Sequence, residues 1–150
     1  MKCIIYTDGS STLTKANPTG DGGYAYVILD NNKNEVYRCY NKYRGTSAAC
    51  ELMAGLSALE WAVENNYTEA KIYSDSTYFV NSYNSWIHGW NRRNWKSRSY
   101  DEVANVDIMK NLFKVKAKIK SSAVHVRGHN GNQYNELVDE LANKARQENG

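Results

Sequence analysis

The sequence has few of the features that mark secreted proteins, membrane proteins or proteins stabilised by structural metals. Its 150 residues include one proline and three cysteines without a C-x-x-C pair, which argues against a disulfide framework and against a zinc knuckle. No apolar run approaches the roughly 20 residues that cross a bilayer, and the opening letters MKCIIYTDGS place an acid and a glycine where a signal peptide is apolar. We therefore expect a cytoplasmic protein without a membrane anchor, whose cysteines are reduced thiols.

Low-complexity tracts, internal repeats and linker-like stretches are also lacking. A chain of this length can bury a core without disulfides or structural metals. The whole chain, residues 1–150, is therefore predicted to form a single domain.

An excess of one charge sign is nearly absent, since 19 Lys and Arg are set against 16 Asp and Glu, for a net charge of +3. The distribution is less even than the total. Arg92, Arg93, Lys96 and Arg98 follow Trp86 without an intervening acid. A second basic run, KNLFKVKAKIK, is interpreted as the solvated face of a helix.

Segments with strand or helix patterns alternate along the chain. Strand-like content or alternation occurs in residues 2–8, 22–30, 35–43, 69–75 and 123–129. Apolar residues recur at helical spacing in residues 50–66, 76–86, 104–119 and 135–147.

This order of elements predicts an α/β fold with a five-stranded mixed sheet flanked by helices. The turn sequences GDGG and DNNKN join the first three strands, as expected for antiparallel neighbours. The last two strands follow helices, and such crossovers make a strand parallel to its neighbour.

Four acids occupy informative positions in this plan. Asp8 and Asp75 end strand patterns, where open α/β sheets place ligands, and Glu51 and Asp139 lie in the first turns of the first and last long helices. Each alone has an ordinary explanation as a cap or as a partner of the helix dipole. If the two strands are neighbours, however, the four carboxylates converge, and such crowding requires hard cations such as Mg²⁺. The group therefore indicates metal-dependent phosphoryl transfer.

The motifs that contain these acids resemble those of the cellular, type 1 ribonuclease H family. They are YTDGS, CELMAGLSALE, YSDSTYFVNSYNSWIHGW and VRGHNGNQYNELVDELA, in family order from about Ile4 to Ala145. The resemblance implies the strand order 3-2-1-4-5, with the first three strands antiparallel and helices on both sides of the sheet. It also implies an endonuclease that hydrolyses the RNA strand of RNA/DNA hybrids with little sequence specificity.

By this resemblance the catalytic residues are Asp8, Glu51, Asp75, His129 and Asp139, and the four carboxylates bind metal. The family mechanism uses two Mg²⁺ ions bound with the substrate, with Mn²⁺ as a possible alternative, and it leaves 5′-phosphate and 3′-hydroxyl ends. Asp8 would bridge both ions, Glu51 and Asp75 would complete one coordination shell, and Asp139 would serve the other. His129 lies in RGHNGNQYNE, a segment typical of a loop, and would assist proton transfer or product release.

The resemblance also assigns residues to the hybrid, which is the expected partner. Arg44, Thr46 and Asn105 would form a pocket for a DNA phosphate, and Tyr78 and Trp86 would line a channel for deoxyribose. The residues themselves allow other roles, since Thr46 and Asn105 could cap helices and Trp86 could belong to the core.

Further contacts are implied outside this pocket. Asn17 matches an asparagine that lies in the minor groove, and the segment NSWIHGWNRRNWK matches a basic protrusion laid along the phosphates of the DNA strand. The basic residues assigned to the hybrid in this protrusion are Arg92, Arg93 and Lys96. A solvated basic face is the alternative, and Trp90 and Trp95 are expected mainly to pack against the body of the protein.

One departure from the family lies just before Glu51. Many bacterial members carry asparagines where this chain has Ser47 and Ala48, so the grip on the hybrid there would be weaker or made by the backbone.

Three rival interpretations remain. Integrases, transposases and junction resolvases share clustered acids but lack the protrusion and the GHNGN segment, and a module that binds hybrids without cutting would lack one carboxylate. In the third, the chain is one domain of a polymerase-like protein. A start at Met1 directly before the first strand favours a free-standing protein, for which no obligate protein partner is expected.

Overall fold

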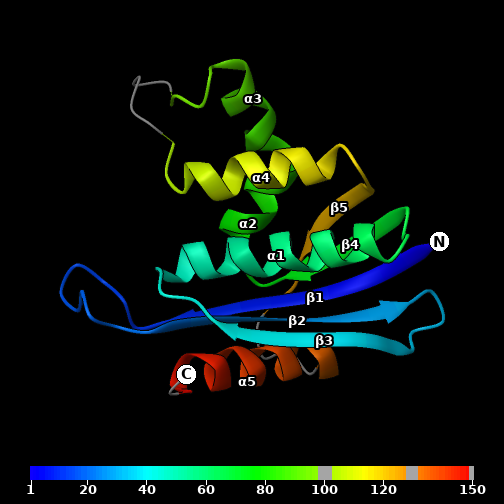
Figure 1. Cartoon of the computed structure of the whole chain (residues 1–150), viewed down its shortest axis with the longest axis horizontal. Helices are drawn as coiled ribbons and strands as arrows, with labels where there is room; N and C mark the ends of the chain where they lie inside the picture. The colour runs from blue at the N-terminus through cyan, green and yellow to red at the C-terminus, as the bar shows by residue number, and fades with distance from the viewer. Residues whose placement is uncertain (98–102, 128–131, 149–150) are drawn as a thin grey trace.

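The computed structural model describes residues 1–97, 103–127 and 132–148, and Figure 1 shows the arrangement of their helices and strands. The strands are β1 (Lys2–Ser11), β2 (Gly22–Asp30), β3 (Glu35–Lys42), β4 (Glu69–Ser74) and β5 (Lys120–His125). The helical segments are α1 (Ser47–Glu64), α2 (Thr77–Asn81), the π-helical turn η1 (Ser82–Trp86), α3 (Ile87–Arg92), α4 (Val106–Lys116) and α5 (Gln133–Gln147).

The five strands form one mixed sheet in the order β3-β2-β1-β4-β5. β1 pairs antiparallel with β2, and β2 pairs antiparallel with β3. β4 lies parallel to both β1 and β5, because α1 and the helical segments α2 to α4 provide the crossovers that parallel strands require. The predicted fold class and strand order are confirmed.

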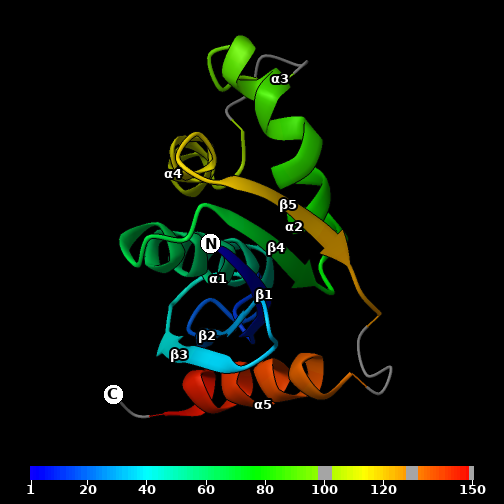
Figure 2. The same cartoon turned by 90° about the vertical axis from the view of Figure 1, so that its right-hand side faces the viewer.

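Helices cover both faces of the sheet, as Figures 1 and 2 show. α1 packs on one face with α2 and α4 beside it, and α5 packs on the other face over β1, β2 and β3. Because successive side chains of a strand point to opposite faces, one strand contributes to both cores. Tyr26 and Ile28 of β2 face the α1 core, whereas Val27 and Leu29 face the α5 core.

Three helices begin two or more residues away from the predicted positions, among them α5, which starts two residues earlier, at Gln133. α1 starts three residues earlier, at Ser47, because the Thr46 hydroxyl accepts a hydrogen bond from the Ala49 amide at 3.2 Å and caps the helix. α4 starts two residues later than predicted, after Asn105, whose backbone is left-handed with φ of 57°.

Four strands also differ from the prediction; β3 and β4 each end one residue earlier, and β1 and β5 differ by more. β1 continues to Ser11, because its second half pairs with β2 as far as Ser11 opposite Gly22. Asp8 therefore lies inside this strand and not at its end. β5 starts three residues earlier and ends four residues earlier than predicted, because it pairs with β4 from Lys120 opposite Glu69 onward.

The helix predicted for residues 76–86 is longer and less regular than expected. It runs through α2, η1 and α3, and in the wider η1 turn the Asn84 side chain faces β5. Asn84 Nδ2 donates to the Ala123 carbonyl at 2.8 Å, and Asn84 Oδ1 accepts from the Ala123 amide at 2.9 Å. The Tyr83 hydroxyl lies 2.5 Å from Ser121 Oγ. These contacts fix the helix to the outer edge of the sheet.

All three cysteines are free thiols. Burial raises the pKa of the Cys3 and Cys50 thiols to about 11, so both are protonated and unreactive at neutral pH. Within the described parts of the chain, no helix has both the length and the apolar character that a membrane crossing requires.

Gly55 of α1 lies against the buried ring of Phe79, since a Cβ there would stand 2.5 Å from Phe79 Cζ. We predict that Gly55→Ala lowers the free energy of unfolding by about 1–3 kcal/mol, because overpacking outweighs the better helix propensity of alanine. Urea unfolding followed by circular dichroism measures the change. Glu60→Ala, at an exposed position of the same helix, should be nearly neutral. The effect of Gly55→Ala should shrink in a Phe79→Leu background, and equal effects in both backgrounds would contradict the overpacking.

Candidate active site

The parallel ladder between β1 and β4 brings Asp8 and Asp75 together. Its last pair is Tyr6 opposite Tyr73, and each aspartate follows two residues later. The two therefore lie at the same level on adjacent strands. β1 runs on as a partner of β2, with Asp8 opposite Ala25, whereas β4 ends at Ser74, so that Asp75 follows directly after the strand.

Glu51 reaches the same place from α1, and Gly9 makes this approach possible. A Cβ at Gly9 would stand 2.6 Å from the Glu51 amide nitrogen and 2.7 Å from the Cys50 carbonyl carbon. Only a residue without a side chain lets the first turns of α1 lie this close to β1. The Gly9 amide also donates a hydrogen bond to Asp8 Oδ1 at 2.9 Å, which orients that carboxylate.

The three carboxylates form a tight group. One oxygen each from Asp8, Glu51 and Asp75 lies within 4.8 Å of the other two. Asp8 is 4% exposed and Glu51 9%, while Asp75 is half-buried. Glu51 Oε2 is buried and has no hydrogen-bond partner among the described residues. A buried carboxylate oxygen without a hydrogen-bond partner destabilises the fold unless a cation or a donor binds it.

Burial and mutual repulsion raise the pKa values of these acids above their ordinary values. Burial raises the pKa of Asp8 to about 8, with the charge of Asp75 adding to the effect. Burial also raises the pKa of Glu51 well above its usual range, and the Asp8 charge acts in the same direction. The pKa of Asp75 is raised by burial and then by the charge of Asp139. Without a cation, the group therefore resists being fully ionised near neutral pH.

Asp139 approaches the group from α5. It is half-buried and close enough to Asp8 and Asp75 to raise the pKa of both, but it is not one of the three carboxylates within 4.8 Å. Two layers of helix and the sheet between them thus supply the four acids.

The donor set fits a hard divalent cation. Carboxylate oxygens are the ligands that Mg²⁺ and Mn²⁺ prefer. Glu51 Oε2, which has no hydrogen-bond partner among the described residues, offers one such ligand inside the group. Asp8, Glu51 and Asp75 would hold the cation, with Asp139 beside them. A cation here can polarise a phosphate oxygen and activate water.

Comparison with known proteins agrees with this chemistry. The model of the RNase H family matches residues 1–147. The chain belongs to the RNase H family. Similar proteins include a Ribonuclease H of Caulobacter sp. (strain K31), 35% identical over 141 residues, which cover 94% of this chain and 87% of the relative. A Ribonuclease H of Syntrophomonas wolfei is 35% identical over 144 residues, 95% of this chain and 94% of the relative.

A solved structure shares the RNase H fold. The foamy viral protease-reverse transcriptase in complex with an RNA/DNA hybrid matches with a TM-score of 0.86 and 20% identity, over 97% of this chain and 20% of that one. At this identity the likeness concerns the fold alone.

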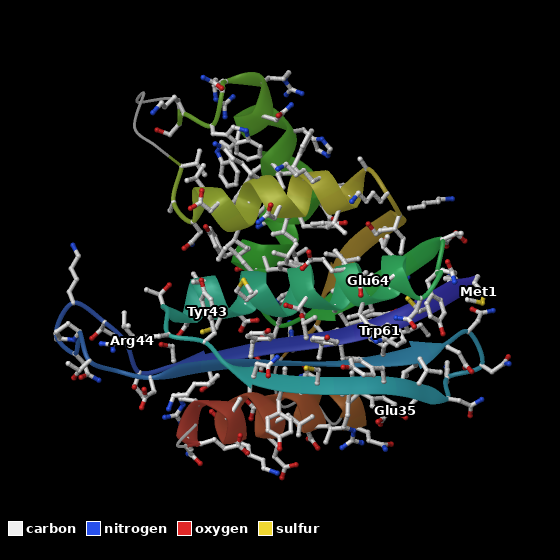
Figure 3. The ribbon with its side chains drawn as sticks, viewed as in Figure 1. Met1, Glu35, Tyr43, Arg44, Trp61 and Glu64 are labelled. Carbon is white, nitrogen blue, oxygen red and sulfur yellow. The ribbon has the colours of Figure 1, made fainter. Side chains whose placement is uncertain are left out.

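The residues that the RNase H resemblance assigns to a DNA phosphate lie near the starts of α1 and α4, which point the same way in Figure 1. Thr46 caps α1, as the alternative interpretation predicted. Asn105 makes no capping hydrogen bond within the described chain; its Nδ2 donates instead to the Tyr78 hydroxyl at 3.3 Å. Arg44 is exposed near the β1–β2 loop in Figure 3, and its Nη2 donates to the Pro18 carbonyl at 2.9 Å. The structure thus joins Asn105 to Tyr78 and Arg44 to the loop.

Asn17 lies exposed in the β1–β2 loop of this RNase H chain. Its Nδ2 donates to the Thr12 carbonyl at 2.9 Å, so the side chain also shapes its own loop. His129, the remaining expected catalytic residue, lies outside the described residues.

The basic protrusion carries its charges outward. Trp86 is 45% exposed, so the interpretation of this residue as core is wrong. Trp90 and Trp95 are half-buried and pack against the α1 core, which confirms their predicted role. Arg92, Arg93 and Lys96 are exposed. Trp86, Trp90 and the two arginines help to line a hollow of about 450 Å³.

A hydrogen-bonded link between α5 and β1 was not predicted. Arg146 Nε donates to Ser10 Oγ at 2.9 Å, and Ser10 Oγ donates to Asn143 Oδ1 at 2.6 Å. Ser10 lies two residues after Asp8, and Asn143 lies one helical turn after Asp139, so the link fixes the spacing of these two acids. The four-residue step from Asp139 to Asn143 was the available signal, but it does not indicate a partner on another strand.

We predict that Asp8→Asn stabilises the metal-free protein, and more strongly at pH 9 than at pH 5. The folded pKa of about 8 lies above the ordinary value of 3.8, so folding retains a proton that the unfolded chain releases. This stabilising contribution is complete below about pH 4 and is lost as the pH rises through about 8. The advantage of the amide should grow by about 1–3 kcal/mol over the interval, because each pKa unit corresponds to about 1.4 kcal/mol and neighbouring acids share the effect.

Thermal unfolding in EDTA at both pH values measures the difference. Glu140→Gln, an exposed acid next to Asp139, should show no such pH dependence. Added Mg²⁺ should reverse the order, because only the intact site gains stability from binding. An equal gain for Asp8→Asn at pH 5 and pH 9 would refute the assignment of a raised pKa.

Proposed function

We propose that the protein is an endonuclease that hydrolyses the RNA strand of RNA/DNA hybrids and leaves 5′-phosphate and 3′-hydroxyl ends, with little sequence specificity. The observation that carries this proposal is the group formed by Asp8, Glu51 and Asp75 in a chain of the RNase H family. Relatives named Ribonuclease H and a similarly folded protein in complex with an RNA/DNA hybrid support the choice of substrate.

The proposed metal ligands are Asp8, Glu51, Asp75 and Asp139, with Mg²⁺ as the expected ion and Mn²⁺ as an alternative. Two ions bound with the substrate would neutralise the crowded charge and supply the Lewis acidity and activated water for in-line displacement at phosphorus. The protein orients the ligand side chains, since the Gly9 amide orients Asp8 and the capped start of α1 holds Glu51 against β1. The ligand oxygens are thereby arranged before a cation binds.

The proposed roles of the acids come from the family resemblance, and their neighbours support them. Asp8 is proposed to bridge the two ions, because Glu51, Asp75 and Asp139 all act on its carboxyl group. Glu51 and Asp75 would complete one coordination shell, and Asp139, approaching from the α5 side, would serve the other. His129 is proposed to transfer a proton or to assist product release near neutral pH.

The proposed grip on the DNA strand uses donors near the starts of α1 and α4. The Thr46 hydroxyl accepts a hydrogen bond as a cap and can still donate its own hydrogen to a phosphate. The Asn105 amide and the Arg44 guanidinium would complete the phosphate pocket. Tyr78, which accepts a hydrogen bond from Asn105, and the exposed Trp86 would line the deoxyribose.

Further contacts would come from the minor groove and from the protrusion. The proposed residues are Asn17, Arg92, Arg93 and Lys96, all of which are exposed. The arginines and the lysine would bind phosphates through charge, which gives affinity without reading base sequence.

The proposal also covers the domain organisation, the protein partners and the cellular location of the enzyme. Residues 1–150 would act as one domain on the hybrid, without an obligate protein partner. A cytoplasmic location is proposed on the basis of the three free thiols, which persist in a reducing compartment.

We predict that the protein cuts a labelled RNA only when it is paired with DNA and only with Mg²⁺ or Mn²⁺ present. Asp75→Asn should lower the rate by more than about 100-fold, since loss of even a supporting residue of a metal site costs 10- to 100-fold. Gel analysis of end-labelled RNA as single strand, RNA duplex and hybrid gives the measurement, and Glu140→Gln should cut normally. Binding of the hybrid without cutting would favour a binding module, and cutting of DNA junctions would favour an integrase-like enzyme.

We predict that replacing both Arg92 and Arg93 by alanine weakens hybrid binding and makes it less sensitive to salt. The slope of log affinity against log salt should fall by about 1–2, since each lost phosphate contact removes about one counterion release. Fluorescence anisotropy in an Asp75→Asn background measures binding without cleavage. The matched control replaces Lys114 of α4 and Lys118 just after it, two exposed lysines of the run that is interpreted as a solvated face. Equal slopes for both double variants would argue against a phosphate-binding protrusion.

A further inference from the structure

α5 covers only part of its face of the sheet. It packs on β1, β2 and β3, and among the described helices none covers the same face of β4 and β5 (Figure 2). Since Ala70 and Ile72 of β4 point into the α1 core, the alternating residues of β4 point the other way. We call this side of β4 and β5 the open face, together with Ile4 and Tyr6 of β1, which border it and pack against the α5 core. Its strand residues, in register, are Ile4, Tyr6, Glu69, Lys71, Tyr73, Lys120, Ser122 and Val124.

A row of three half-buried tyrosines crosses the open face. The Tyr6 ring lies between Tyr73 of β4, at 5.1 Å between centroids and 18° between planes, and Tyr134 of α5, at 5.4 Å and 34°. Lys71 Nζ stands 5.9 Å from the Tyr73 ring centroid. These tyrosines, together with Lys33 and neighbouring residues, line a hollow of about 300 Å³. The aromatic rings on the sheet are thus only half-buried beside the start of α5.

The charge of the open face is basic. Glu69 lies between Lys2 and Lys120, at 3.6 Å and 3.9 Å from their Nζ atoms, and cannot neutralise both. Lys71 adds a further positive charge, and these four residues help to line a second hollow of about 210 Å³. Lysines beside exposed aromatic rings are the combination that binds single-stranded nucleic acid, since bases stack on the rings and phosphates meet the cations.

The open face ends at the candidate active site. Tyr6 precedes Asp8 by two residues within β1, so these two side chains lie on the same side of that strand, and Tyr73 lies two residues before Asp75 at the end of β4. A nucleic acid strand at the carboxylates can therefore continue onto the tyrosines. A paired strand cannot stack there, because its bases are already stacked inside the duplex.

We infer that the open face binds an unpaired RNA segment continuous with the strand that is cut. Bases of this segment stack on Tyr73 and Tyr134, and its phosphates meet Lys71 and Lys33. The inference rests on the proposed function, and it concerns the substrate that the enzyme prefers: a hybrid whose RNA strand extends beyond the paired region.

The test compares cleavage of a blunt hybrid with hybrids that carry eight unpaired RNA nucleotides at the 5′ or the 3′ end of the RNA strand. A tail at one end should lower KM roughly five- to tenfold, as expected for a few stacked bases, and leave kcat unchanged. A tail of the same length without bases keeps the phosphates and should lose most of the gain. The same tail on the DNA strand should give none.

Two variants separate stacking from charge. Tyr134→Leu keeps the apolar volume and removes the outer ring, and Lys71→Glu reverses one charge. Both should abolish most of the benefit of the tail and leave the KM of the blunt hybrid unchanged. Lys114→Glu, on α4, is the matched charge control and should keep the benefit. Thermal unfolding checks that each variant is folded.

The outcomes distinguish this inference from the proposed function. Normal cutting of the blunt hybrid with no benefit from either tail would overturn only the inference, as would a benefit that survives in both variants or is equal for the tail without bases. Failure to cut any hybrid would overturn the proposed function itself.

Discussion

Repulsion between carboxylates in a place with little water is the constraint on which this structure depends. Water normally screens such groups, but Asp8 and Glu51 are almost fully buried and Asp75 is half-buried beside them. The repulsion is relieved when some of the carboxyl groups stay protonated, or when bound cations neutralise the carboxylates instead. The same crowding that weakens the metal-free fold therefore creates the affinity for divalent ions, and stability and chemistry draw on one interaction.

Holding the acids together requires rigid support from three directions. The β1–β4 ladder fixes two aspartates at one level, the contact across Gly9 brings α1 to within reach, and the link from Ser10 to Asn143 and Arg146 holds α5. None of these three contacts uses the side-chain carboxylate of one of the four acids. Backbone pairing, close packing and the hydrogen bonds of Ser10 thus do the positioning, which leaves the acid oxygens available for a ligand.

The family resemblance predicted the sheet order, and the strand and helix patterns predicted that Asp8, Glu51 and Asp75 converge. The strand pattern placed Asp8 at the end of a strand, since the polar letters after it hide the pairing of residues up to Ser11 with β2. Thr46 illustrates a residue whose two expected roles are compatible, since a capping hydroxyl retains a donor. The left-handed Asn105 and the π turn at Asn84 could not be predicted, because both depend on partners far away in the chain.

The pairing of Asn84 with Ala123 has a meaning beyond local geometry. β5 is an outer strand, and the unpaired amide and carbonyl groups of such a strand can recruit another chain. The asparagine carboxamide imitates a peptide group and pairs with both the amide and the carbonyl of Ala123, so these two groups are not free to pair with another strand. Because the same residue belongs to the helix that leads into the basic protrusion, the end of the sheet and the direction of the protrusion are set together. The start of the protrusion is thus tied through Ala123 to β5, the strand next to the one that leads to Asp75.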